Sequence, residues 1–166
     1  MRSFVAQAVL NRRLEARARA GAYLYAAVQQ DDVYRSADTT FISVGPLEGD
    51  WEGALEEVRG IIADAIANPP SQEEIDREVS DYQVGYQDYY DKRQLRPSDE
   101  LADDIIGAID IRETVTSPGA VLRLFASALP SFTPENIHEA TRDLFEGTVG
   151  RALLVANRPG MADDAA

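Results

Sequence analysis

The stretch VLNRRLEARARAGAYLYAAV, residues 9–28, changes from helical to strand character at Gly21. Before this glycine, apolar residues recur every three or four positions and arginines occupy the positions between them. After it, the chain combines aromatic and small side chains, which is typical of a strand. The sequence therefore predicts a helix over residues 3–19 that leads into a strand over residues 22–30.

A second strand and two longer helices follow. Residues 39–44, TTFISV, are rich in β-branched side chains and predict an antiparallel partner for the first strand, with Asp31-Asp32 turning the chain between them. A helix begins at Asp50, a suitable N-cap, and closes at Asn68-Pro69-Pro70. The next helix begins at SQEE, residues 71–74, which has the pattern of a capping box.

The rest of the chain predicts three shorter helices and one strand. Ser98, Ser117 and Thr133 each occupy a plausible N-cap position, and the last two precede a proline, which favours the first helical position. Residues 152–156, ALLVA, have the character of a buried strand, and residues 160–166 that of a disordered tail. About six helices would pack on one face of a small, mainly antiparallel sheet, an α+β fold. Because a sheet of three strands is small for so many amphipathic helices to pack on, we expect leading strands to be missing.

The composition indicates one acidic domain, which we place at residues 1–159. The 166 residues are 45% hydrophobic, enough for a sizeable core, and 29 acidic against 16 basic residues give a net charge of −13. This charge would repel nucleic acid and anionic membranes, so neither is an expected partner. No apolar run approaches the roughly 20 residues of a membrane span. The absence of cysteine excludes disulfides and thiolate metal sites.

The sequence offers few side chains for catalysis. His138 is followed by Glu139, but a zinc-peptidase helix needs a second histidine and this chain has one. We therefore expect His138 to be a solvated or partly packed helix residue. The acidic pairs lack the alternating ligands and central glycine of a calcium loop, so we expect solvated faces and turns at residues 31–32, 103–104 and 163–164. The sequence predicts no catalytic residue and no metal ligand.

The order and spacing of several short motifs resemble the non-catalytic domain of the insulinase-type (M16) zinc metallopeptidases. The resemblance runs from about residue 8 to residue 159 and points to bacterial members with two tandem halves. The motifs that carry it are LNRRLE at residues 10–15, the strand after Gly21, FISVGP at 41–46, GDW at 49–51, AL at 54–55, SQEEI at 71–75, TSP at 116–118, FTPENI at 132–137 and LLV at 153–155.

The resemblance implies a supporting role inside a larger zinc protease. The family's inverted zinc motif H-x-x-E-H is absent here, so the zinc ion would belong to a catalytic domain elsewhere in a parent protein. Family members use an arginine and a tyrosine near the helix-to-strand junction to hold substrate, and the nearest candidates are Arg19 and Tyr25. Their spacing departs from the usual pattern, and Tyr23 competes. In the alternative interpretation, Arg19 is a helix C-terminal cation favoured by the macrodipole and Tyr25 is an ordinary sheet residue.

Two functions are compatible with the residues and with the resemblance. The first is a fragment of a zinc metallopeptidase that shapes the substrate chamber and contacts peptide without cleaving it. Its expected partners are the other domains of the parent protease and a peptide substrate. The second is a stand-alone, catalytically inactive relative that acts as an interaction or assembly module. A homo-oligomer through an open sheet edge is compatible with the sequence, and the compartment stays open between the bacterial periplasm and the cytoplasm.

Overall fold

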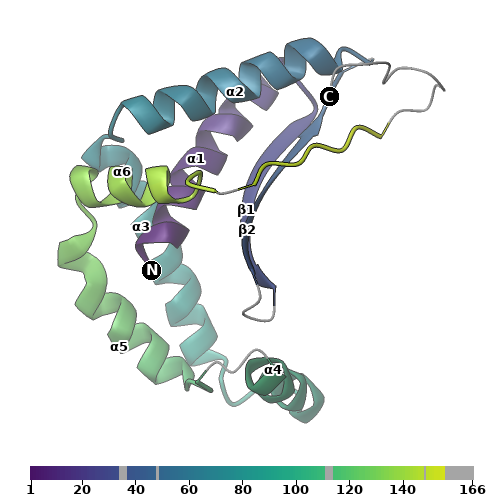
Figure 1. The fold of residues 1–166 in the computed structure, drawn as a ribbon. Helices are drawn as coiled ribbons and strands as arrows, with labels where there is room; N and C mark the ends of the chain where they lie inside the picture. Colours follow the sequence, from purple (N-terminus) through teal and green to yellow (C-terminus); the bar gives the residue numbers. More distant parts are fainter. Residues whose placement is uncertain (34–36, 48, 111–113, 148, 156–166) are drawn as a thin grey trace.

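The computed structural model describes residues 1–33, 37–47, 49–110, 114–147 and 149–155, which form an α+β fold (Figure 1). This part of the chain contains the six predicted helices and one two-stranded antiparallel sheet. The elements in chain order are α1 (Arg2–Arg19), β1 (Tyr25–Val33), β2 (Ala37–Gly45), α2 (Trp51–Ala67), α3 (Gln72–Asp91), α4 (Ser98–Asp110), α5 (Pro118–Ala128), the 3₁₀ helix η1 (Leu129–Ser131) and α6 (Pro134–Asp143).

Helix α1 is the centre of the fold because two hydrophobic cores lie along it. In Figure 1 it runs behind α2 and α6, and it contacts both of them as well as α3 and β1. Its N-terminal half joins a first core with α3, α5 and α6, and its C-terminal half joins a second core with α2 and the sheet. The first core contains Val5, Ala6, Val9, Ile75, Phe125, Phe132, Ile137, Ala140 and Leu144, and the second contains Leu10, Leu14, Tyr23, Val28, Ala54, Val58, Ile62 and Ala65.

Aromatic side chains close the first core between α3 and α5. Tyr86 lies 5.0 Å from Phe125 between ring centroids, and Tyr82 lies 6.2 Å from the same ring. Phe132 continues the cluster at 5.6 Å from Phe125. Both tyrosines are only partly buried, so the tyrosines of α3, which recur every three or four residues, form an edge of the core.

The helix starts follow local capping chemistry. Asp50 caps α2 by accepting a hydrogen bond from the amide three residues later, at 3.1 Å. Ser71 and Glu74 form the predicted capping box, in which the serine oxygen accepts from the Glu74 amide at 3.2 Å and the glutamate accepts from the Ser71 amide at 2.9 Å. Ser117 and Thr133 cap α5 and α6, and a proline follows each of them. These predicted caps are confirmed.

The two strands alternate between a helix-covered face and an uncovered one. Val28 pairs with Ile42 and Tyr25 with Gly45, so even-numbered residues share one face and odd-numbered residues the other. We call the even-numbered face, on which α1 and α2 pack, the inner face and the odd-numbered face the outer face. Asp31 lies within β1, not in a turn, because the paired strands are longer than the sequence predicted.

The prediction of a buried strand at residues 152–156 is wrong over its described part. Residues 152–155 form no strand, and Leu153 and Val155 are 89% and 84% exposed, because the described part of the sheet ends at β2 and gives them no neighbouring strand. The apolar stripe of α4 is also exposed: Leu101 and Ile105 are at least 40% accessible, since no other described element packs closely on this helix. Residue 156 and the predicted tail at 160–166 lie outside the described residues. None of the described helices is long and apolar enough for a membrane span.

Candidate functional site

The two candidate substrate-binding residues lie at the junction between α1 and β1. Arg19 is the last residue of α1, and its Nη2 donates to Glu15 Oε1 at 2.6 Å while its side chain stays 74% exposed. Tyr25 is the first residue of β1 and lies on the outer face, 57% exposed. Its ring covers Gly45 so closely that a Cβ on Gly45 would overlap it. Both residues are therefore accessible, and their role in substrate binding stays a prediction.

Tyr23, which competed for the tyrosine role, is a core residue. Its side chain is 1% exposed, and its hydroxyl donates to the carbonyl oxygen of Leu14 at 2.8 Å. Burial raises the pKa of Tyr23 above the ordinary value for tyrosine because the phenolate would lose its hydration. Tyr23 is thus unavailable to a ligand, whereas Tyr25, two residues later, is exposed on the sheet.

The outer face around Tyr25 carries a second half-exposed aromatic side chain. Phe41 in β2 is 49% exposed and opposes Gln29 across the strands, and the neighbouring Ser43 is exposed as well. Aromatic rings next to polar side chains suit the contact of an extended peptide, because the rings supply apolar area and the polar groups can hydrogen-bond. We call this surface the candidate peptide-contact face; Arg19 lies at the end of α1, on the helix that packs on the opposite face of the sheet.

Three other arginines of α1, namely Arg12, Arg13 and Arg17, pair with carboxylates on neighbouring helices. Arg12 reaches α3, where its Nε and Nη2 donate to the two oxygens of Glu78 and Nη2 also donates to Asp81 at 2.7 Å. Arg17 reaches α2 and donates to Glu57 at 2.5 Å. These carboxylates raise the pKa of each arginine above its usual value by stabilising the cation. Arg12 and Arg17 are therefore already neutralised by carboxylates of neighbouring helices and are not free for an anionic ligand.

Arg13 makes a second bidentate ion pair between α1 and α3. Its Nε and Nη2 donate to the two oxygens of Glu74 at 2.7 and 3.1 Å, and Asp64 lies 3.6 Å from Nη1. The bond from Arg13, with smaller contributions from the Ser71 cap, lowers the pKa of Glu74 from 4.5 to about 2. The carboxylate with this lowered pKa caps the start of α3 and joins α3 to α1. The pKa shift therefore has a structural cause.

Sequence reasoning missed two side chains that bind the free edge of β1. Asn11 Nδ2 donates to the Val28 carbonyl at 2.9 Å, and its Oδ1 accepts from the Val28 amide at 2.7 Å. Gln7 Oε1 accepts from the Gln30 amide at 3.2 Å. The available signal was the pair of amide side chains four residues apart, each directly after an apolar residue of the helix.

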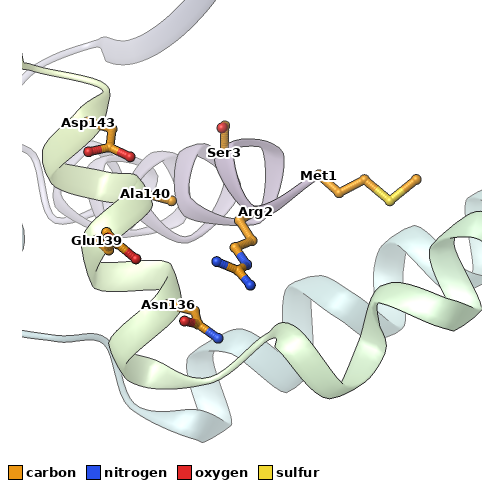
Figure 2. A pocket seen from close by; sticks show the side chains of 7 residues that line it. All are labelled: Met1, Arg2, Ser3, Asn136, Glu139, Ala140 and Asp143. Atoms are coloured by element: carbon orange, nitrogen blue, oxygen red, sulfur yellow. The ribbon is translucent and has the colours of Figure 1, made fainter.

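A shallow depression of about 320 Å³ lies between the start of α1 and the face of α6. Figure 2 shows the Arg2 guanidinium between the two helices, near Asn136, with the carboxylates of Glu139 and Asp143 on α6. The other lining residues are Met1, Ser3 and Ala140. No pairing of a nucleophile with a base occurs among these side chains, so the depression has no evident catalytic chemistry.

His138 is held by a backbone contact. Its Nε2 lies 2.8 Å from the carbonyl oxygen of Ile66 at the end of α2, and since a carbonyl only accepts, Nε2 carries the proton. The prediction of a partly packed helix residue is confirmed. In the part of the chain that the structure describes, no three His, Cys, Asp or Glu side chains lie close enough together to hold a metal ion. The described donor set therefore does not fit a zinc site.

The fold is shared with a protease. The sequence matches no protein-family model and no curated protein. The periplasmic protease PqqL from Escherichia coli matches over 87% of this chain and 16% of its own, with a TM-score of 0.78 and 16% identity. A structure of the first half of PqqL matches over 86% of this chain and 31% of its own, with the same TM-score and identity. This chain spans less than a third of either structure. The likeness supports the M16 fold, and at this identity it shows the fold alone.

Proposed function

We propose that this chain is a non-catalytic domain of an M16-type zinc metallopeptidase, one that shapes the substrate chamber and contacts peptide without cleaving it. The observation that carries the proposal is the backbone likeness to the periplasmic protease PqqL over 87% of the chain. The motif order along the sequence independently resembles the same family. PqqL is a periplasmic protease, and we propose the same compartment for the parent protein.

The side chains present support a non-catalytic role. The family's chemistry needs a zinc ion with histidine and carboxylate ligands, and this chain has one histidine, whose Nε2 donates to Ile66. The zinc ion would therefore belong to another domain of the parent protein. This domain would contribute walls and contacts, and its partners would be the other domains of the protease and the peptide substrate.

The candidate peptide-contact face would supply those contacts. Tyr25 and Phe41 are half-exposed rings on the outer face, and they would pack against the side chains of an extended peptide. Arg19 forms an exposed ion pair with Glu15, and such a pair is worth little in water. A peptide carboxylate could therefore replace Glu15 at small cost, which would use Arg19 to orient the substrate.

A hydrolysis assay with the purified chain tests the absence of catalysis. We expect no cleavage of a quenched fluorescent peptide in the presence of zinc, and no zinc that stays bound in stoichiometric amount after gel filtration. Zinc-dependent cleavage that a chelator abolishes and that survives repurification would contradict the proposal. An immunoblot of the source lysate separates the two functions: a band several times the 18.2 kDa of this chain fits a protease domain, and a band at 18.2 kDa fits a stand-alone module.

Peptide binding tests the positive part of the proposal. Fluorescence anisotropy with a labelled, unstructured peptide that has a free C-terminal carboxylate should show weak binding by the native chain. Arg19→Ala and Tyr25→Ala should each weaken it by roughly tenfold, the equivalent of one good polar or aromatic contact. Arg123→Ala is the matched control, because Arg123 is an exposed arginine on α5, a helix that packs on α3 and not on the sheet. Equal affinity of all variants would remove this face from the proposal.

A further inference from the structure

The two edges of the sheet differ in how they are protected. Side chains of α1 bind outward backbone groups of β1: Asn11 binds both the amide and the carbonyl of Val28, and Gln7 binds the amide of Gln30. An edge closed in this way cannot receive another strand unless these bonds break. The edge of β1 is therefore sealed by the chain itself.

The edge of β2 has no comparable cover among the residues that the structure describes. Because Val28 directs its backbone groups away from β2, its partner Ile42 must direct its own away from β1. The backbone groups of Thr40 and Val44, two residues to either side of Ile42, also point away from β1. No backbone hydrogen bond from another described residue reaches these outward groups. Thr40 bonds to the Leu144 carbonyl at 2.6 Å only through its side-chain hydroxyl.

The β2 edge also lacks the usual protective side chains. Exposed edges are commonly blunted by charged residues, proline, a bulge or a short length. Strand β2 has nine residues in unbroken register; its one charged residue, Asp38, lies at the hairpin end, and residues 39–45, TTFISVG, include neither a charged residue nor a proline. Elsewhere the chain carries a net charge of −13, which would repel a second copy. This neutral edge is the place where two copies could meet without opposing carboxylates.

We propose that β2 pairs with β2 of a second copy, in an antiparallel arrangement centred on Ile42. In this register Ile42 opposes Ile42 of the second copy, and Thr40 opposes Val44, so the outward backbone groups bond to each other. Ile42 is 46% exposed on the inner face although its neighbours there are packed, and the pairing would cover it. The result is one continuous sheet with two strands from each copy. The inference concerns this 166-residue chain and does not rest on the proposed peptidase role.

The dimer is tested by the molar mass of the chain in solution. In sedimentation equilibrium, the average molar mass should rise from 18.2 kDa toward twice that value. The rise should occur as the chain concentration increases from about 1 μM to 1 mM. Ile42→Lys and Ile42→Glu each place like charges opposite one another and should raise the dissociation constant at least about tenfold. Val84→Lys is the matched control, because Val84 is 68% exposed on α3 and remote from the edge. An equal mixture of the lysine and glutamate variants should restore the heavier species.

The results separate this pairing from other arrangements. A native chain that stays at 18.2 kDa throughout overturns the proposal. So does a dimer that Ile42→Lys leaves intact, because another surface then holds it. A mixture of the two charged variants that stays monomeric overturns the register centred on Ile42. Circular dichroism would confirm that each variant is folded.

Hydrogen exchange of the native chain tests the same edge without a substitution. The amides of Ile42 and Val44 point outward from β2, so they should exchange fast at low concentration and become protected as the concentration rises. Protection that does not depend on concentration would mean that the chain covers its own edge, for example with the exposed residues 151–155, and would overturn the proposal. Fast exchange at every concentration would overturn it as well.

Discussion

The side chain of Asn11 binds the backbone of Val28 as a neighbouring strand would. It donates to the Val28 carbonyl at 2.9 Å and accepts from the Val28 amide at 2.7 Å, which is the paired pattern of two residues in an antiparallel ladder. One amide side chain therefore both satisfies an outward-facing residue of β1 and fixes the sheet to α1. Val28 itself is fully buried in the second core.

Asn11→Ala should destabilise the chain by about 1–3 kcal/mol, because both backbone groups of Val28 lose their partner in a buried position. Asn11→Asp should also destabilise it, since a carboxylate can still accept from the amide but cannot donate to the carbonyl. Urea unfolding followed by circular dichroism measures both effects. Gln83→Ala, at an exposed position of α3, is the control and should change little. Similar stability of all three variants would contradict this account of the β1 edge.

The ion pair between Glu74 and Arg13 predicts a loss of stability in acid. Because the pKa of Glu74 is about 2 in the folded chain and 4.5 ordinarily, its contribution is complete above pH 4.5 and is lost as the pH falls toward 2. The full pKa shift corresponds to at most about 3 kcal/mol in the free energy of unfolding. Because one third of the Glu74 side chain is exposed and water screens the pair, we expect about 1–2 kcal/mol.

Glu74→Gln isolates this contribution in urea unfolding at a series of pH values. The variant should be less stable than the native chain near neutral pH, and the difference should shrink toward zero in acid. Glu73→Gln is the matched control, because Glu73 is 87% exposed and lies 3.5 Å from Arg77, so it should show little difference at any pH. A stability difference for Glu74→Gln that does not vary with pH would refute the assignment.

The buried carboxylate of Glu78 makes Arg12 important for stability. Glu78 has a side chain only 7% exposed, and Arg12 is its main partner. Arg12→Ala should cost about 2–4 kcal/mol because it leaves the carboxylate buried and uncompensated. The double variant Arg12→Met, Glu78→Met should cost much less than the sum of its single changes. A thermal unfolding series measures this coupling, and additive effects would show that the pair does not interact.

The helix starts could be predicted because their chemistry is local. Ser71 and Glu74 are three residues apart, and the capping box needs no knowledge of the rest of the fold. The tyrosine stripe of α3 was likewise visible from its spacing. In the candidate site, the sequence located the junction at Arg19 and Tyr25, but only the structure shows that the competing Tyr23 is buried.

The wrong prediction concerns a feature that depends on distant neighbours. The run at residues 152–155 has the pattern of a buried element, as does the apolar stripe of α4, but burial needs a partner surface that a pattern does not supply. The pairing of Arg12 with Glu78 was invisible for the same reason, since the two residues are 66 positions apart. Long-range partners are therefore the information that this single sequence lacked.

Tyr23 and Tyr25 should respond oppositely to substitution. Tyr23→Phe removes a buried hydroxyl that donates to the Leu14 carbonyl, so we expect a loss of about 1 kcal/mol in the free energy of unfolding. Tyr25→Phe should leave stability almost unchanged, because Tyr25 is 57% exposed. Since burial raises the pKa of both Tyr23 and Tyr82, their phenolate absorbance should appear late in an alkaline titration, and the amplitude of this late step should fall in Tyr23→Phe. If Tyr25→Phe lowers that amplitude instead, the assignment of core and surface tyrosines is reversed.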